Sequence, residues 1–420
     1  MDRRVFIKNI GLASLMPMVG NLLWACTPSE NSGKRIFVFI QLMGGNDGLN
    51  TLIPLDNYKN FVTARPNIYI PESKILDLKG NPLTGLHPAM KGLQEMYNNG
   101  LVSFVQNVGY EKPSYSHFRS ADIWLTGSQA DEALFTGWMA RYLENRYNGY
   151  PKGFPNSQFP HPPAIKVGEA GTMLFEAEAM DMSIVVSPSE DGFDDLGESQ
   201  SHEIGTGYAV EEIKSIKEVL LQTDKYTPVL REAISTPFKH SSLYPEKGEN
   251  PLADQLKVVA KLIHGGLETS VYHVDMKGFD THEHQVDDND STKGVHADLL
   301  GKLSHAITCF WDDMVAMGRE DDVAGMTFSE FGRRIISNSS GGTDHGAAQP
   351  LILFGGGVSG GIIGANPVIP DKAAAMDNLY SEISFKSVYS SLLKDWFRAD
   401  DTILKQSVGG SGPQISLFRI

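Results

Sequence analysis

Residues 35–51 read RIFVFIQLMGGNDGLNT, and they carry the clearest structural signal in the chain. The stretch begins with a run of β-branched and aromatic residues, 35–42, which glycines follow closely, as is typical of a buried strand. Similar short apolar runs recur at residues 101–108, 183–187, 270–276, 323–328 and 351–354. The sequence therefore predicts buried strands along most of its length.

Helical patterns lie between these strands. In residues 251–265, apolar residues recur at spacings of four, three and four, and Pro251 suits the first position of a helix. Residues 295–317 show the same kind of apolar stripe. Strands separated by helices indicate an α/β fold in which a largely parallel central sheet is sandwiched by helices.

The composition is that of a globular protein with an acidic surface. Hydrophobic residues make up 41% of the chain and charged residues 21%. The 36 basic and 51 acidic side chains give a formal net charge of −15. Nucleic acid is therefore an unfavourable partner, because its recognition requires a basic surface.

The first 26 residues, MDRRVFIKNIGLASLMPMVGNLLWAC, resemble an export signal. The pair Arg3-Arg4 precedes a short apolar stretch, which is typical of the twin-arginine route. The ending Leu-Trp-Ala-Cys resembles a lipoprotein processing box, so Cys26 is expected to carry a lipid. The alternatives are a buried N-terminal helix or a signal anchor. With Cys26 lipidated, Cys309 is the one remaining thiol and no intramolecular disulfide is possible.

The organisation that follows is a signal peptide at residues 1–26, a polar tether at 27–34 and one α/β domain at 35–420. Within the domain, residues 146–163 are rich in Pro, Gly and Asn and are expected to form a surface excursion. Residues 187–207 are acidic and turn-rich, so we expect a lid or a loop insertion there.

Four glycine-containing segments carry side chains that can bind metals, and three of them follow a predicted strand. Ligand sites in open α/β sheets form at the carboxyl ends of strands. The first segment holds Asp47, a hard oxygen ligand. The second holds Asp280, His282 and His284, which would share one face of an extended segment. Aspartate with histidine suits Zn²⁺ or a similar ion. The alternatives are a helix-capping turn for the first segment and a solvated loop for the second.

The third segment, FSEFGRR, holds Glu330 as a possible ligand and Arg333 and Arg334 as possible clamps for an anionic oxygen. A surface Arg–Glu pair is the alternative. The fourth segment, GGTDHG, holds Asp344 and His345.

One further segment, residues 115–120, offers a nucleophile. Ser116 or Ser120 is a candidate for that role, and His117 is a candidate ligand or base. A serine that caps the following helix explains the pattern equally well.

The motifs GGNDGLNT, YSHFRSADIW, GFDTHEHQ, FSEFGRR and GTDHG occur in this order along the chain. Together they resemble the exported bacterial family called domain of unknown function 1501 (DUF1501). That family is similar to the alkaline phosphatase and sulfatase superfamily, so the resemblance implies an alkaline-phosphatase-like fold. It also implies a metal site built from the residues matched here: Asp47, Asp280, His282 or His284, Glu330, Asp344 and His345.

The chain departs from the superfamily at two points. The pattern that usually surrounds the nucleophile is not recognisable, so Ser116 is assigned by position alone. Glu330 stands where Asp-His is more usual, so a second metal would be absent or differently held.

The resulting expectation is an exported, lipid-anchored hydrolase of a phosphate or sulfate ester in the periplasm or outer membrane of a bacterium. One or two divalent ions (Zn, Mn, Mg, Fe or Ca) would serve as cofactors, with Ser116, His117 and Arg333 assisting catalysis. The expected partners are a small-molecule, glycan or lipid ester and, through Cys26, the membrane. The alternative is a non-catalytic cell-envelope protein that uses the same fold for binding or assembly.

Overall fold

The computed structural model describes residues 35–178, 180–188, 209–410 and 412–419, without the side chains of residues 209–220. The chain divides into two units, Met1–Gly33 and Lys34–Ile420, and the described residues belong to the second. The predicted signal peptide and tether, together with most of the predicted loop at 187–207, lie outside the described residues.

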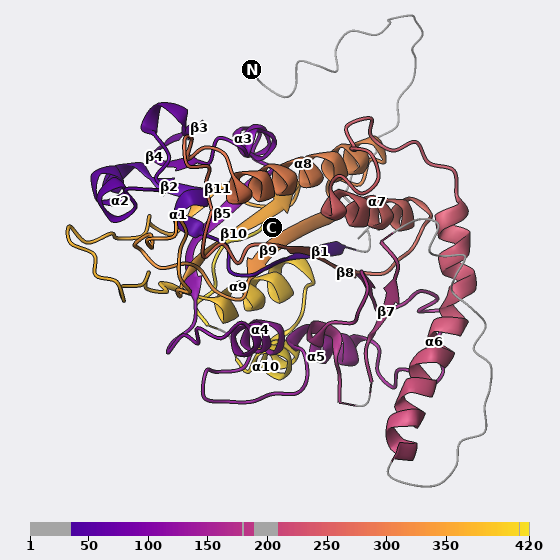
Figure 1. The fold of residues 1–420 in the computed structure, drawn as a ribbon. Coiled ribbons are helices and arrows are strands. Elements are labelled where there is room, and N and C mark those ends of the chain that lie inside the picture. Colours follow the sequence, from indigo (N-terminus) through magenta and orange to yellow (C-terminus); the bar gives the residue numbers. More distant parts are fainter. Residues whose placement is uncertain (1–34, 179, 189–208, 411, 420) are drawn as a thin grey trace, which may run out of the picture. The chain divides into compact units, whose positions relative to one another are not determined.

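The described residues form a nine-stranded sheet in which β1 (Ile36–Met43) is central (Figure 1). The strand order is β11-β5-β10-β9-β1-β8-β6-β7, and β12 also pairs with β5. The bounds of the other strands are β5 (Val102–Gly109), β6 (Ala164–Val167), β7 (Ser183–Val186), β8 (Val271–Lys277), β9 (Val323–Ser329), β10 (Gln349–Gly355), β11 (Gly361–Ile363) and β12 (Ile383–Ser384).

Most neighbouring strands run parallel, and β10 is the exception. β1 pairs in parallel with β8 and with β9, while β10 is antiparallel to both β9 and β5. β5 therefore runs in the same direction as β1, β8 and β9, and the carboxyl ends of these four strands lie at one edge. Because β10 begins where β9 ends, the connection between them stays at this edge as well.

The alternation of residues along β1 separates two apolar layers. Ile36, Val38 and Ile40 belong to one buried cluster, and Phe37 and Phe39 belong to the other, because successive side chains of a strand point to opposite faces. The first cluster takes in residues of α3 (Lys91–Asn98), α6 (Ala209–Ser235), α7 (Pro251–His264) and α8 (Val295–Ala316). The second takes in residues of α4 (His117–Thr126), α5 (Trp138–Arg146), α9 (Phe385–Ser391) and α10 (Asp401–Val408).

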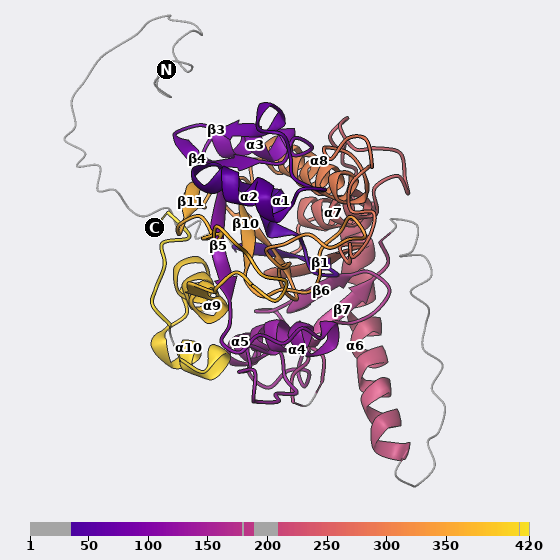
Figure 2. The same ribbon diagram turned by 60° about the vertical axis from the view of Figure 1, so that its left-hand side comes forward.

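Helices therefore cover both faces of the sheet, as Figures 1 and 2 show from two directions. This arrangement confirms the predicted α/β class with a largely parallel, helix-sandwiched sheet. The predicted strands at 101–108, 183–187, 270–276, 323–328 and 351–354 correspond to β5, β7, β8, β9 and β10. β6 was not predicted, and residues 147–163 before it contain no helix or strand.

A smaller antiparallel sheet follows β1 in the chain. It consists of β2 (Leu52–Pro54), β4 (Asn81–Leu86) and β3 (Leu76–Leu78), and α3 packs against β3 (Figure 2). The short helices α1 (Gly48–Thr51) and α2 (Tyr58–Ala64) belong to the same region. Among the described residues, no helix combines the length and apolar character that a membrane span requires.

Candidate metal centre

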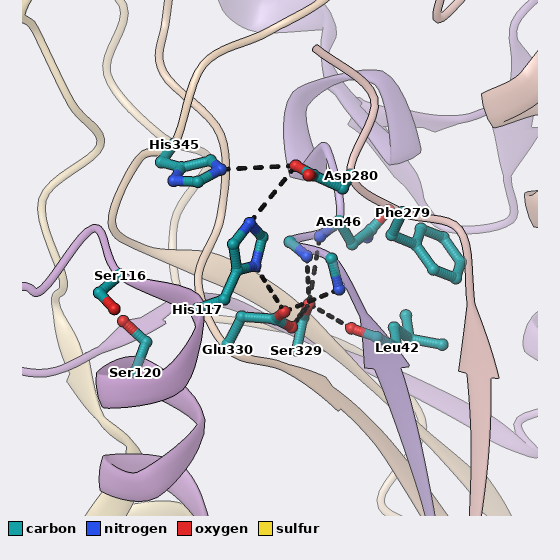
Figure 3. Close-up of polar contacts among 12 residues, drawn as sticks. Leu42, Asn46, Ser116, His117, Ser120, Phe279, Asp280, Ser329, Glu330 and His345 are labelled. Atoms are coloured by element: carbon teal, nitrogen blue, oxygen red, sulfur yellow. Dashed lines mark hydrogen bonds and ion pairs between the residues drawn. The ribbon is translucent and has the colours of Figure 1, made fainter.

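Three side chains converge at the edge where β1, β5, β8 and β9 end. His117 opens α4, Asp280 follows β8, and His345 lies in the connection from β9 to β10. The Nε2 atoms of His117 and His345 lie 3.5 and 3.4 Å from Asp280 Oδ1. One donor atom from each residue lies within 4.8 Å of the other two, so this group could hold a metal ion (Figure 3).

The remaining ring nitrogens of both histidines are held by acceptors. His117 Nδ1 lies 3.0 Å from Glu330 Oε1, and His345 Nδ1 lies 2.7 Å from the carbonyl oxygen of Tyr115. A carboxylate and a carbonyl can only accept, and both lie closer to Nδ1 than Asp280 Oδ1 lies to Nε2, so they favour the tautomer with the proton on Nδ1. In that tautomer each Nε2 can offer its lone pair to a metal ion. Metal-binding histidines are oriented in this manner in proteins. The donor set therefore fits a divalent ion.

The electrostatics of the centre favour the metal-binding states of Asp280 and His345. Burial alone would raise the pKa of Asp280, but the hydrogen bond and charge of Arg333, together with the charges of His282 and His117, outweigh it and lower that pKa. Burial lowers the pKa of His345; the hydrogen bond with the Tyr115 carbonyl opposes this, but the charges of Arg333, His117 and His282 lower the pKa further. Asp280 is therefore a carboxylate and His345 a neutral imidazole at neutral pH.

Arg333 is a buried support for this centre. It is 1% exposed, and its Nε and Nη1 donate to the carbonyl oxygens of Gly45 and Thr343 at 2.7 and 2.8 Å. Its Nη2 lies 2.7 Å from Asp280 Oδ1. The guanidinium predicted to clamp a substrate oxygen thus lies within the protein, where it holds Asp280.

Gly44 allows the turn after β1 to approach Asp280 closely. Its φ is +123°, and a Cβ there would lie 2.3 Å from the backbone nitrogen of Asp280. We expect Gly44→Ala to displace Asp280 and to lower metal affinity by more than tenfold, measured by chelator competition. Gly80→Ala is the control, because Gly80 also has a positive φ (+81°) but no atom within 4 Å of its Cβ position. Equal affinities of the two variants would contradict this role of Gly44.

Asp47, predicted as a ligand, lies in a buried ion pair instead of in this group. It is 0% exposed, and its Oδ2 accepts from Arg65 Nη1 and from Gln285 Nε2, each at 2.6 Å. Burial would raise the pKa of Asp47, but the charges of Arg65 and His296 and the hydrogen bonds from Arg65 and Gln285 lower it.

Two buried histidines near Asp47 are expected to make stability depend on pH. Burial is the main cause that lowers the pKa of His296 to about 4 and that of His87 to about 3. In the unfolded chain both would titrate near 6.5. The unfolded state therefore binds protons first as the pH falls, so stability is complete above about pH 6.5 and declines from there towards pH 4.

For each histidine this decline amounts to at most about 1.4 kcal/mol per pH unit. The measurement is urea unfolding between pH 7.5 and 5, and His296→Gln should flatten the slope. A free energy of unfolding that is constant over this range would contradict the expectation.

The other predicted residues are placed as follows. His282 Nδ1 lies 2.8 Å from Asp280 Oδ1, which makes His282 the nearest additional donor. Asp344 is exposed, and its Oδ1 accepts from Asn338 Nδ2 at 3.0 Å. His284 lines a separate open pocket of about 580 Å³ together with the acidic loop 287–290. The structure therefore brings His282 to the centre. Within the described part of the chain, no hydrogen bond or ion pair joins the side chain of Asp344 or His284 to the ligand group.

The two candidate serines differ in their surroundings. Ser116 is exposed at the N-cap of α4, next to His117. Ser120 is buried, and its Oγ donates to the carbonyl of Ser114 at 2.7 Å and lies 3.0 Å from Tyr110 Oη. Figure 3 shows both hydroxyls on the α4 side, away from Asp280.

Sequence reasoning missed the acceptors behind the histidines. Tyr115 acts through its backbone carbonyl, which no side-chain pattern reveals. Glu330 was predicted as a ligand, and its contact with His117 joins residues 213 positions apart. For His117, the sequence offered one indication of a role in the site, namely its position directly after Ser116 at the start of a helix.

The fold and the site together define an α/β protein with a candidate metal centre at the carboxyl edge of its sheet. The family model described as "Protein of unknown function (DUF1501)" matches residues 246–387. This match confirms the resemblance to DUF1501 over a segment that holds Asp280, Glu330 and His345. Asp47 and His117 lie outside the matched segment.

Several solved structures are similar to this chain. A phosphonate monoester hydrolase from Silicibacter pomeroyi has 9% identity, with 91% of this chain and 78% of that chain covered and a TM-score of 0.40. A PsFucS1 sulfatase from Pseudoalteromonas sp. has 10% identity, with coverages of 86% and 67% and a TM-score of 0.38. An alkaline phosphatase from the Antarctic bacterium TAB5 has 10% identity, with coverages of 79% and 94% and a TM-score of 0.30. None of the curated proteins compared with the sequence matches it.

Proposed function

We propose that this chain binds a divalent metal ion through His117, Asp280 and His345 and hydrolyses a phosphate or sulfate ester. The observation that carries the proposal is the convergence of two Nε2 atoms on Asp280 Oδ1, with both Nδ1 atoms held by acceptors. The order of motifs that resembles DUF1501, and through it the alkaline phosphatase and sulfatase superfamily, supports the ester chemistry.

Two imidazoles and one carboxylate favour Zn²⁺, Mn²⁺ or Fe over Ca²⁺. A bound ion would polarise the ester oxygen and activate the attacking water or hydroxyl. His282 is the additional donor closest to Asp280 and is the residue that would help to hold a second ion.

In this proposal Arg333 maintains Asp280 as a carboxylate instead of binding the ester, because the guanidinium is buried and bonded to backbone carbonyls. Ser116 is the proposed nucleophile among the side chains, since its exposed hydroxyl precedes His117 at the N-cap of α4. Water is the competing nucleophile.

We also propose that residues 1–25 are removed on export and that Cys26 carries a lipid, which would place the protein in the periplasm or at the outer membrane. The Arg3-Arg4 start and the Leu-Trp-Ala-Cys ending support this. Mass spectrometry of protein from its native host would test it, and an unmodified Met1 would exclude cleavage. The substrate would then be a small-molecule, glycan or lipid ester of the cell envelope.

The test of function combines elemental analysis with an assay. Purified protein is expected to contain about one divalent ion per chain and to hydrolyse members of a panel of aryl phosphates, phosphodiesters and aryl sulfates. Ser116→Ala should abolish turnover if the serine is the nucleophile and should leave it intact if water attacks. Protein that binds no Zn²⁺, Mn²⁺ or Fe²⁺ would overturn the proposal. Metal-loaded protein that is inert on the whole panel would favour the binding or assembly protein instead.

A further inference from the structure

Glu330 occupies an unusual position beneath the candidate metal centre. It is the first residue after β9, and it is 6% exposed. Its Oε1 accepts from the backbone nitrogen of Gly44 at 2.8 Å and lies 3.0 Å from His117 Nδ1. Its Oε2 lies 3.0 Å from the hydroxyl of Ser329. A buried carboxylate is costly unless such partners compensate it, so this position calls for an explanation.

The geometry separates Glu330 from the metal ligands. His117 stands between the two carboxylates, with Nε2 facing Asp280 and Nδ1 facing Glu330 (Figure 3). The ligand group made by His117, Asp280 and His345 does not include Glu330. The carboxylate thus lies behind the imidazole, on the side opposite the proposed ion.

We propose that Glu330 is a positioning residue that fixes the proton of His117 on Nδ1 and so keeps Nε2 available for the metal. This inference rests on the proposed function, because it assigns a role within the same metal centre. A free imidazole can carry its proton on either nitrogen, and a proton on Nε2 would block the ligand position. A charged acceptor at Nδ1 also raises the basicity of the ligand nitrogen.

Glu330 at the same time connects two other parts of the site. Its hydrogen bond from Gly44 ties it to the turn after β1, and that turn lies against the backbone of Asp280. One carboxylate therefore sets the orientation of His117 relative to the segment that holds Asp280. His345, in contrast, relies on the carbonyl of Tyr115 and needs no charged partner.

The first test examines the proton directly, without metal or substrate. In metal-free wild-type protein, nitrogen chemical shifts from NMR are expected to show His117 and His345 both protonated on Nδ1. Glu330→Met removes the acceptor, so His117 should lose this preference while His345 retains it. His345 thereby reports whether the variant is still folded around the site. A His117 tautomer that is unchanged in Glu330→Met would overturn the proposal.

The second test measures metal affinity by competition with a chelator for Zn²⁺. Glu330→Met is expected to bind Zn²⁺ about 10- to 100-fold more weakly than the wild type, as is usual when a residue that hydrogen-bonds to a metal ligand is lost. The Zn²⁺ affinity of Glu330→Gln should lie between those of the wild type and Glu330→Met. Asp344→Asn is the matched control, because Asp344 is an exposed carboxylate beside His345 that does not contact His117. It should change the affinity by less than about fivefold.

Equal losses in Glu330→Gln and Asp344→Asn would mean that only the overall charge matters, and would overturn the positioning role. If the wild type binds no metal, the proposed function fails, and the NMR result still decides whether Glu330 controls the tautomer.

Discussion

Asp280→Asn is expected to abolish stoichiometric metal binding, with the affinity for Zn²⁺ reduced by more than about 100-fold. Mutation of a residue that only hydrogen-bonds to a metal ligand typically lowers metal affinity about 10- to 100-fold, and loss of a direct ligand must lower it further. Asparagine keeps an oxygen that can accept from Arg333, so the fold should survive while the negative charge at the centre is lost. The measurement is metal content per chain after dialysis, followed by chelator competition. Any ester turnover should disappear with the metal.

Asp288→Asn is the control for this change. Asp288 is exposed in the acidic loop 287–290, which carries more carboxylates than the metal centre but contains no histidine of its own. Charge runs of this kind are usually solvated. We therefore expect Asp288→Asn to keep the wild-type metal content. Similar losses in both variants would place the metal in the acidic loop and would refute the proposed centre.

Arg65→Leu is expected to produce the largest loss of stability, about 3–5 kcal/mol in the free energy of unfolding. Arg65 and Asp47 are both fully buried, and the Oδ1 of Asp47 already has no hydrogen-bond partner among the described residues. Removing the guanidinium would leave an uncompensated carboxylate in the core. It would also free the carbonyl oxygens of Ile335 and Arg334, which the guanidinium now binds at 2.9 and 2.7 Å.

Urea unfolding of metal-free protein measures this effect separately from metal binding. The double variant Asp47→Asn/Arg65→Leu should recover part of the lost stability, because the amide is neutral and can still accept from Gln285. A loss below about 1 kcal/mol in Arg65→Leu, as for an exposed pair, would contradict the buried ion pair.

The sequence was sufficient to predict the sheet because its central strands are buried on both faces. Runs such as 35–42 and 323–328 are apolar nearly throughout, and this pattern is typical of strands covered by helices on both sides. The antiparallel direction of β10 was not predictable, because an apolar run looks the same whether the strand runs parallel or antiparallel to its neighbours. β6 was missed because Lys166 interrupts its four residues.

The candidate site was predictable only in part. Asp280 and His345 could be predicted as site residues, because each lies in a glycine-containing segment next to a predicted strand, and the structure brings them together. Asp47 has the same kind of sequence context, yet it pairs with Arg65, which comes from the end of α2. Nothing in the residues around Asp47 reveals that partner, since the pairing depends on how α2 packs. The roles of the individual side chains in metal binding and catalysis stay predictions.

The reversed direction of β10 has a consequence for how the centre would assemble during folding. Glu330, Arg333 and His345 all lie in the connection between β9 and β10, which leaves and re-enters the sheet at the same edge. Closing this connection, residues 330–348, costs less chain entropy than bringing in Asp280 or His117 from more distant parts of the chain. We therefore expect this hairpin-like segment to form early as a template, onto which the turn after β8 and the first turn of α4 later dock.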